Sequence, residues 1–402
     1  MSFASFGLNP ALLQAIESKG YSQPTPIQSE AIPAILNRQD VMAGAQTGTG
    51  KTAAFALPIL HLLEASEEVN ARVQALVLTP TRELAQQVGK SFQQYGAHTS
   101  LRTVVAYGGV SINNQLSVVK QGVDILVATP GRLIDLLGRQ AIDLSCLSFF
   151  VLDEADRMLD MGFIDDIKRI LRSVPETRQT LLFSATFDDA IFKLSQKLLH
   201  DPALIEVDQR NATASQVEQI AYEVDKHRKR EITSFLIGSK NWQQVLIFTR
   251  TKKSADDLAK EMCKDGLKTE AIHGDKSQGA RERALEGFKD GSIRVLVATD
   301  VASRGLDIPQ LSYVINYELP HNAEDYIHRI GRTGRAGETG LAISLLSADE
   351  TWLLDEIHKI IDTRLMQQWL PGYEPSLEQD FAQKPKAGRG NRNKNRGRSR
   401  RR

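Results

Sequence analysis

The chain has 402 residues, of which 41% are apolar and 25% charged, and its formal net charge is +1. This length is too great for a single core and predicts two or three domains. No apolar run approaches the roughly 20 residues of a membrane span, and the first residues lack a secretory signal pattern. The two cysteines, Cys146 and Cys263, have no histidines at ligand spacing. We therefore expect a soluble cytoplasmic protein without a disulfide framework, structural zinc or membrane partner.

Short β-branched runs alternate with amphipathic helical patterns through residues 1–207. The predicted strands are Ala75–Thr79, Thr103–Ala106, Ile125–Ala128, Phe149–Asp153 and Thr180–Ser184. Helical patterns such as Arg82–Tyr95 and Ile164–Ser173 lie between them. Such alternation predicts a mostly parallel sheet flanked by helices, so residues 1–207 form a first α/β domain. The polar segment 208–217 is interpreted as a linker.

The same alternation restarts in residues 218–365, which predicts a second α/β domain. Its predicted strands are Val245–Thr249, Ala271–His273, Val295–Thr299, Val314–Tyr317 and Ala342–Leu346, and its predicted helices include Ser254–Asp265 and Asp349–Arg364. Residues 366–402 are interpreted as a C-terminal extension. Its last part, 384–402, contains ten Lys or Arg and no acid, which leaves −9 for residues 1–383. This tail is expected to be disordered, and we interpret it as an RNA tether rather than a merely solubilising segment.

The strongest local motif is the run Ala45-Gln46-Thr47-Gly48-Thr49-Gly50-Lys51-Thr52 between an apolar segment and a helical pattern. Glycines allow backbone N–H groups to converge on phosphate oxygens, and the helix N-terminus adds positive potential. Lys51 is expected to reach the β- and γ-phosphates, and the Thr52 hydroxyl to bind Mg²⁺. The general phosphate-loop pattern begins with glycine where this chain has Ala45, but Gly48 and Gly50 still provide the glycines that allow the loop to surround a phosphate.

A second motif, Asp153-Glu154-Ala155-Asp156, follows the apolar run Phe149–Leu152. Carboxylates after a strand lie at the sheet edge where α/β proteins bind ligands. Asp153 is expected to hold Mg²⁺, and Glu154 to orient and deprotonate a water. The alternative, an acidic N-cap that stabilises the next helix, fits the tetrapeptide alone. The phosphate loop favours the catalytic interpretation.

Asp153-Glu154-Ala155-Asp156 is the signature of the DEAD-box RNA helicases, and motifs in that family's order run from Phe3 to Arg335. The chain resembles this family, and its short N-terminus and basic tail resemble the RhlE-type branch. The resemblance implies two tandem RecA-like domains that use ATP and Mg²⁺.

The segment from Gly20 to Gln28 resembles the family's adenine-reading motif, which also includes Tyr21. An amide offers a donor and an acceptor together and so matches adenine, whereas guanine presents two acceptors at that edge. Gln28 is therefore expected to select ATP over GTP. The family stacks an upstream aromatic on the base; Phe3 lies at the matching distance, Phe6 is nearby, and Phe3 could instead be a core anchor.

By the same resemblance, residues in both domains bind the phosphates and sugars of RNA. In the first domain these are Pro80, Thr81, Arg82, Gly108, Gly109, Thr129, Pro130, Gly131 and Arg132, and in the second Gly274, Gln278, Arg281 and Thr299. Strand-end turns expose N–H groups and hydroxyls that suit a backbone. Each short motif alone is also compatible with ordinary turn chemistry.

The run His328 to Arg335 carries arginines three residues apart, with small residues between Arg332 and Arg335. The resemblance implies that Arg332 and Arg335 are arginine fingers that contact the γ-phosphate. A solvated basic helix is the alternative. Gly305 and Asp307 would contact the nucleotide. Ser184, Thr186 and His328 would couple the nucleotide site to strand separation.

These assignments imply an RNA-stimulated ATPase that binds single-stranded RNA across two domains and locally unwinds short duplexes or remodels RNA–protein complexes. Because the ATP ligands are divided between the domains, hydrolysis is expected to require closure. A DNA-directed helicase on the same scaffold and an ATP-gated RNA clamp with rare turnover are the competing interpretations. Ribosomal or RNA-decay protein partners cannot be identified from the residues.

Overall fold

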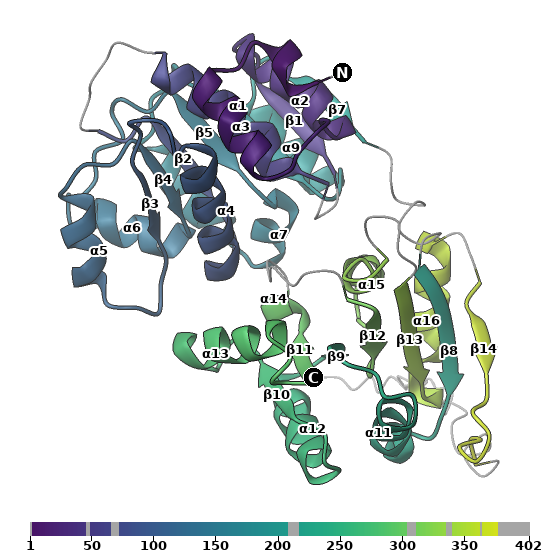
Figure 1. Ribbon diagram of the computed structural model, residues 1–402. Coiled ribbons are helices and arrows are strands. Elements are labelled where there is room, and N and C mark those ends of the chain that lie inside the picture. The colour runs from purple at the N-terminus through teal and green to yellow at the C-terminus, as the bar shows by residue number, and fades with distance from the viewer. Residues whose placement is uncertain are drawn as a thin grey trace, which may run out of the picture.

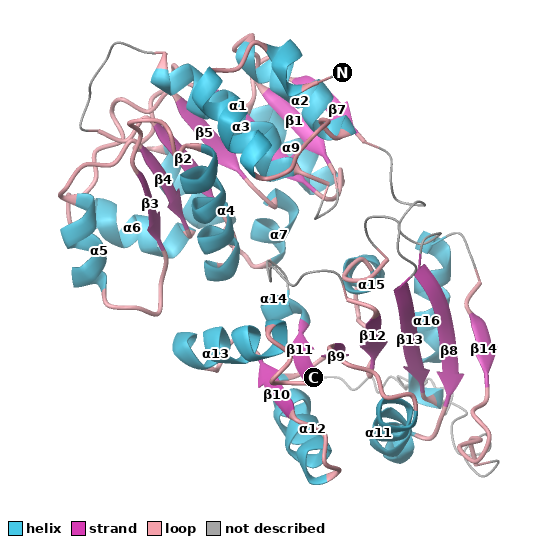
Figure 2. Ribbon diagram, viewed as in Figure 1, coloured by secondary structure: helices cyan, strands magenta, loops and turns pink. Residues whose placement is uncertain are grey.

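The structure is a computed structural model that describes residues 2–45, 49–65, 72–207, 217–303, 311–334, 340–361 and 364–376. Two α/β domains follow one another along the chain, the first coloured purple through blue to teal and the second teal through green to yellow (Figure 1). Helices surround both sheets (Figure 2). No helix among the described residues is both long enough and apolar enough to span a membrane.

The first domain contains a parallel sheet of seven strands within the described residues, in the order β3-β4-β2-β5-β6-β1-β7. Its strands are β1 Val41–Gly44, β2 Ala75–Leu78, β3 Thr103–Ala106, β4 Ile125–Ala128, β5 Phe149–Leu152, β6 Gln179–Ser184 and β7 Ala203–Glu206. Its helices are η1 Phe3–Phe6, α1 Pro10–Ser18, α2 Pro26–Leu36, α3 Lys51–Glu64, α4 Arg82–Tyr95, α5 Ile112–Val119, α6 Pro130–Gly138, α7 Ala155–Asp160, α8 Ile164–Leu171 and α9 Asp189–Leu198.

Alternate residues of each central strand enter two separate cores. In β2, Ala75 and Val77 belong to the cluster shared with α2, α3 and α4, whereas Leu76 and Leu78 belong to the cluster shared with α6, α7 and α8. A strand with helices on both faces buries every residue, and for this reason it appears in sequence as an unbroken apolar run.

The second domain repeats this plan with the strand order β10-β11-β9-β12-β13-β8-β14. Its strands are β8 Val217–Glu223, β9 Val245–Thr249, β10 Thr269–Ile272, β11 Val295–Thr299, β12 Tyr313–Asn316, β13 Gly340–Leu346 and β14 Met366–Gln368. Its helices are η2 Lys226–Arg228, α11 Lys229–Ser239, α12 Lys252–Lys264, α13 Gln278–Lys289, α14 Asp300–Ser303, α15 Ala323–Ile330, η3 Ala348–Glu350 and α16 Thr351–Ile361. Position by position, β8 corresponds to β1, β9 to β2, β12 to β5 and β13 to β6.

The fold class agrees with the prediction, but two domain boundaries differ. Val217, assigned to the linker, is the first residue of β8. The second domain also extends past residue 365, because Met366–Gln368 pair in parallel with Ile220–Tyr222 of β8. The chain continues against this domain to Ser376, whose N–H and hydroxyl both donate to Asp225. Residues 208–216 and the basic tail 384–402 lie outside the described residues.

Candidate nucleotide and RNA site

The carboxyl edge of the first sheet gathers the predicted nucleotide groups. β6 lies between β1 and β5 in the sheet, so the segments that follow these three strands are neighbours. Lys51 follows β1, the Asp153–Asp156 motif follows β5, and the Ser184–Thr186 motif stands at the end of β6. This is the edge at which open α/β sheets bind their ligands.

Lys51 is the first residue of α3, and its ammonium group is buried without a hydrogen-bond partner among the described residues. Gly50 precedes it with φ +92°, a backbone conformation that suits glycine. Thr52 is half-buried beside it. Gln46, Thr47 and Gly48 of the predicted loop lie outside the described residues. A buried ammonium at a helix N-terminus, with no hydrogen-bond partner among the described residues, fits a phosphate group.

Asp153 is buried, and its Oδ1 atom has no hydrogen-bond partner among the described residues. Burial raises the pKa of Asp153 to about 7, although the positive charge of Lys51 opposes the rise. An unsatisfied carboxylate oxygen near the unsatisfied ammonium of Lys51 fits a triphosphate with its divalent cation, which supply an anion and a cation together. Asp153 and Thr52 are the residues that would hold the metal.

Glu154 has φ 55° and ψ 55°, a left-handed conformation that costs free energy for a residue with a side chain. Its Oε2 atom contacts Nη1 of Arg157 at 2.6 Å, and both side chains are buried. Burial would raise the pKa of Glu154, but the charges of Arg157, Lys51 and Arg332 outweigh it and hold the pKa at about 2. Glu154 is therefore a carboxylate at neutral pH. Its partner Arg157 was not among the predicted site residues.

The predicted adenine reader is attached to the phosphate loop. The Gln28 side chain accepts from the Thr25 N–H at 3.0 Å, and its Nε2 donates to the Gly50 carbonyl at 3.1 Å. A Cβ atom on Gly50 would lie 2.3 Å from that Nε2, so the close approach also requires glycine. Tyr21, which belongs to the same predicted motif, has a side chain that is 44% exposed. The residue predicted to recognise the base and the end of the predicted phosphate loop thus share one hydrogen-bonded unit.

Phe3 is only 5% exposed and belongs to the core cluster with α1 and α3. Phe6 is partly buried and contacts Phe3 edge to face, with ring centroids 6.2 Å apart. The burial of Phe3 agrees with the core-anchor alternative that the sequence left open. Base stacking by either ring stays a prediction.

The predicted RNA residues of the first domain form two linked turns. Thr81 caps α4 by accepting from the Leu84 N–H, and the Arg82 side chain lies against Gly109, where a Cβ atom would be 1.9 Å from Nη1. Gly109 has φ +83°, so Gly108-Gly109 is a glycine-dependent turn beneath a guanidinium. Arg82 is thus partly exposed over this turn, as a phosphate contact requires.

Arg132, which the resemblance assigned to RNA binding, makes its contacts within the first domain. It is buried, and its guanidinium donates to Gln115 Oε1 at 2.7 Å and to the Val110 carbonyl at 2.9 Å. Burial lowers its pKa. Arg132 therefore holds the segment after Gly109 in place, while Thr129, Pro130 and Gly131 begin α6 beside it.

In the second domain, Gln278 and Arg281 lie on α13 at the boundary with the first domain. Arg281 Nη2 contacts Glu83 Oε1 at 2.8 Å, with both side chains under 10% exposed, and burial lowers the pKa of Arg281. Glu282 accepts from both Gln278 and Gln86. Glu83 and Gln86 belong to α4, so predicted RNA residues also join the domains. Sequence reasoning missed both acids, although Glu83 stands inside the Pro80–Leu84 motif.

A pocket between α7 and α15 brings together residues of both domains that were predicted to act in catalysis and coupling. Glu154, Arg157 and Thr186 line it from the first domain, and His328 and Arg332 line it from the second. Figure 1 shows α7 on the side of the first domain that faces α14 and α15. Ser184 accepts from the Thr186 N–H, and Asp156 accepts from the Ala185 N–H at 3.1 Å. Gly305, Asp307 and Arg335 lie outside the described residues.

Arg329 is a further organising residue that sequence reasoning missed. It is 1% exposed; its Nε and Nη2 atoms donate to the two carboxylate oxygens of Asp300 at 2.6 and 2.8 Å. Nη1 donates to the Glu318 carbonyl at 2.6 Å. This bidentate pair fixes α15, and hence Arg332, to α14, which follows the predicted RNA residue Thr299. The signal available was the His328-Arg329 dipeptide, which we interpreted only through its neighbours. Gly274 follows β10 near Lys252.

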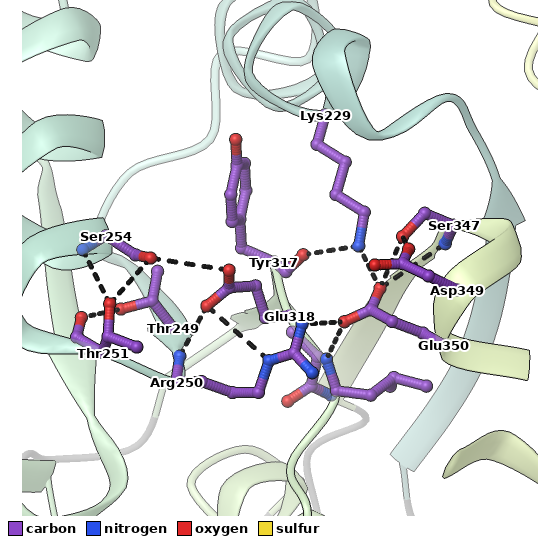
Figure 3. A network of polar contacts seen from close by, with 12 residues as sticks. Lys229, Thr249, Arg250, Thr251, Ser254, Tyr317, Glu318, Ser347, Asp349 and Glu350 are labelled. Atoms are coloured by element: carbon purple, nitrogen blue, oxygen red, sulfur yellow. Dashed lines mark hydrogen bonds and ion pairs between the residues drawn. The ribbon is translucent and has the colours of Figure 1, made fainter. Parts of the chain in front are cut away.

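At the corresponding edge of the second sheet, a lysine is paired with groups of its own domain (Figure 3). Lys229 begins α11 after β8, as Lys51 begins α3 after β1. Its ammonium pairs with Glu350 and donates to the carbonyls of Tyr317 and Leu345 at 3.0 and 2.7 Å. Glu350 Oε1 also contacts Arg250 Nη2 at 3.0 Å. The lysine that would meet a phosphate in the first domain thus has a carboxylate partner in the second.

A buried cation and two carboxylates on one sheet, with an arginine supplied by the next, define a tandem RecA-like nucleotide-dependent protein. The profile of the DEAD/DEAH box helicases matches residues 25–194, and that of the helicase conserved C-terminal domain matches residues 227–337. The DEAD-box ATP-dependent RNA helicase CshA of Bacillus cereus is 42% identical over 377 residues, or 94% of this chain and 71% of CshA. RhpA of Helicobacter pylori is 45% identical over 364 residues, or 90% of this chain and 73% of RhpA. The chain belongs to the DEAD-box ATP-dependent RNA helicases.

Solved structures agree in both domains. The chain is similar to S. cerevisiae Dbp5 bound to RNA and ADP BeF3, with a TM-score of 0.83, 33% identity and coverage of 94% of this chain and 97% of Dbp5. It is also similar to the DEAD-box helicase Mss116 bound to ssRNA and UDP-BeF, with a TM-score of 0.84, 29% identity and coverage of 94% and 80%.

Proposed function

We propose that this protein hydrolyses ATP in response to single-stranded RNA and uses domain closure to open short RNA duplexes or to remodel RNA–protein complexes. The observation that carries the proposal is the pocket between α7 and α15, where Glu154 of one domain and Arg332 of the other lie together. The relatives and the RNA-bound structural neighbours support RNA as the nucleic acid.

The described residues divide the work between binding and hydrolysis. Gln28 reads the base, and the Lys51 ammonium neutralises the phosphates. Glu154 orients the attacking water and takes its proton, while Arg332 stabilises the charge that develops on the transferred phosphoryl group. Because Arg332 arrives with the second domain, the site is complete only when the domains are together. RNA that contacts both domains favours this state and therefore hydrolysis.

Mg²⁺ is proposed as the divalent cation. When bound, Mg²⁺ would supply positive charge that stabilises the transferred phosphoryl group and the leaving diphosphate. Thr52 and Asp153 are the protein ligands that fit it, because Asp153 Oδ1 is buried without a partner among the described residues. Equilibrium binding of a fluorescent ATP analogue, with and without Mg²⁺, tests this assignment in Asp153→Asn.

Steady-state ATPase assays with poly-U and with poly-dU test the function. We expect poly-U alone to stimulate hydrolysis, and unwinding of a short RNA duplex to require ATP. Equal stimulation by both polymers would favour a DNA-directed enzyme, and RNA binding without turnover would favour a clamp. Lys51→Ala should abolish hydrolysis, whereas Lys168→Ala, which removes an exposed cation on α8, should leave it unchanged.

The tail 384–402 is proposed as an RNA tether on its charge alone. If about half of its ten cations each neutralise a phosphate, the logarithmic salt slope of single-strand binding should contain about −3.5 from the tail. A fourfold rise in salt would then weaken tail-dependent binding roughly a hundredfold. Deletion of 384–402 with no change in affinity or slope would refute the tether.

Two finer proposals rest on sequence features. We place the chain with the RhlE-type branch because of its basic C-terminal segment, and a tree of full-length family sequences tests this placement. We place the protein in the cytoplasm because Cys146 and Cys263 are free thiols, and fractionation of cells tests that location.

A further inference from the structure

Arg157 is a buried cation to which the proposed mechanism gives no role. It lies on α7, three residues after Glu154, and the two side chains are 6% and 7% exposed. Arginine is rarely buried unless it is paired. Its Nη1 atom donates to Glu154 Oε2 at 2.6 Å, a charge-assisted hydrogen bond.

The backbone and the ion pair restrain Glu154 together. Its left-handed φ and ψ, both 55°, turn the chain sharply between β5 and α7, and its carbonyl accepts from the Met158 N–H to begin the helix. The turn fixes where the side chain leaves the backbone. The guanidinium fixes where it ends, which a glutamate with several rotatable bonds would otherwise leave variable.

The pair lies where hydrolysis is proposed to occur. Arg157 lines the same pocket as Arg332, and the charges of both arginines act on Glu154. The two guanidiniums come from different domains, so Arg157 is always beside Glu154, whereas Arg332 is beside it only when the domains are together. Arg157 is one turn from Glu154 in the same helix-turn unit, whereas Arg332 reaches the pocket from α15.

We propose that Arg157 is a positioning residue for ATP hydrolysis, whose guanidinium holds the Glu154 carboxylate by Oε2 and leaves Oε1 to meet the attacking water in a fixed direction. This inference rests on the proposed function, because it presupposes that Glu154 directs the water. The opposite role, a latch that withdraws Glu154 from the water until closure, predicts the opposite kinetic effect. Catalytic groups need a rigid supporting shell, and a displacement of about 1 Å can cost about a hundredfold in rate.

RNA-saturated ATPase kinetics of Arg157→Gln, Arg157→Lys and Arg169→Gln test the proposal. Arg169 is an exposed arginine on the neighbouring helix α8 and is the matched control. We expect Arg157→Gln to lower kcat by about tenfold to a hundredfold with little change in KM for ATP. Arg157→Lys should restore part of kcat, because it keeps the charge but not the planar geometry. An unchanged or higher kcat, or a loss confined to KM, overturns the proposal.

A double variant separates positioning from a merely structural effect. In single-turnover assays, Arg157→Gln added to Glu154→Gln should cause no further loss, because the residue acts only through that carboxylate. A full further loss would show an independent role and refute the inference. Should Arg157→Gln not fold, Arg157→Lys carries the test with a smaller fall in kcat at unchanged KM. If the unmodified protein and Arg169→Gln do not hydrolyse ATP with RNA, the proposed function itself fails.

Discussion

Replacement of Glu350 by Gln tests the polar network of Figure 3 through the stability of the second domain. The Lys229 side chain is 3% exposed and that of Glu350 is 1% exposed, so the substitution leaves a buried ammonium without its carboxylate. Loss of one partner of a buried pair costs about 3–5 kcal/mol. Lys229 retains the carbonyls of Tyr317 and Leu345, so we expect a loss near 3 kcal/mol.

Tryptophan fluorescence during urea unfolding measures this loss selectively. All three tryptophans, Trp242, Trp352 and Trp369, lie in the second domain. Trp242 is buried against Tyr313, with ring centroids 4.5 Å apart, so its emission should change when this core opens. A lower midpoint at unchanged slope would mean a loss of stability. Glu356→Gln is the matched control, because it breaks an exposed pair with Lys359 on α16 and should change little.

The pH dependence gives a second check. Burial already lowers the pKa of Lys229, and Glu350 opposes that shift, so Glu350→Gln should lower the pKa further. Between the lowered pKa of the folded variant and the ordinary lysine pKa of about 10.4, the unfolded chain then binds more protons than the folded chain. The deficit of the variant should therefore shrink as the pH rises towards that value. An unchanged midpoint, or a deficit that grows with pH, would refute the reasoning.

Four other substitutions give direct tests of the first domain and the domain contact. Glu154→Gln should trap ATP and RNA with little hydrolysis, measured by turnover and RNA retention; normal turnover would exclude the assigned role. Gly50→Ala should lower the free energy of unfolding by more than about 1 kcal/mol and weaken ATP binding, because alanine is strained at φ +92° and its Cβ meets Gln28. A thermal melt measures the stability and a fluorescent nucleotide titration measures the affinity. An affinity equal to that of the unmodified protein would contradict the predicted contact. Arg281→Ala leaves Glu83 buried without its guanidinium, so the RNA concentration for half-maximal ATPase should rise at least about tenfold. Glu83→Gln should act in the same direction if the ion pair is responsible, whereas an effect of Arg281→Ala alone would indicate an RNA contact only.

The central strands were predictable because burial on both faces makes them unbroken apolar runs. Phe149–Leu152 and Val245–Thr249 are examples, and each was predicted to within one residue. The edge strand Met366–Gln368 was not predictable, since its residues are polar or exposed and only the register with β8 makes it a strand.

The grouping of Lys51, Asp153 and Ser184 at one edge of the first sheet was predictable, because these residues stand at or after strand ends within short motifs. Pairs between distant segments were not, because they depend on how two domains and their helices pack. Arg281 with Glu83 is one such pair, separated by almost 200 residues. The interaction of Arg157 with Glu154 is local, but it depends on the left-handed backbone conformation of Glu154. Glutamate rarely adopts this conformation, so the residue type does not predict it.

The pairing of Lys229 with groups of its own domain has a consequence for thermal unfolding. A ligand raises the melting temperature of the unit whose folded form it binds, by an amount set by its concentration relative to Kd. Nucleotide without RNA should therefore shift the melting of the first domain and leave the tryptophan-detected transition of the second where it was, since Glu350 already satisfies Lys229 at every nucleotide concentration.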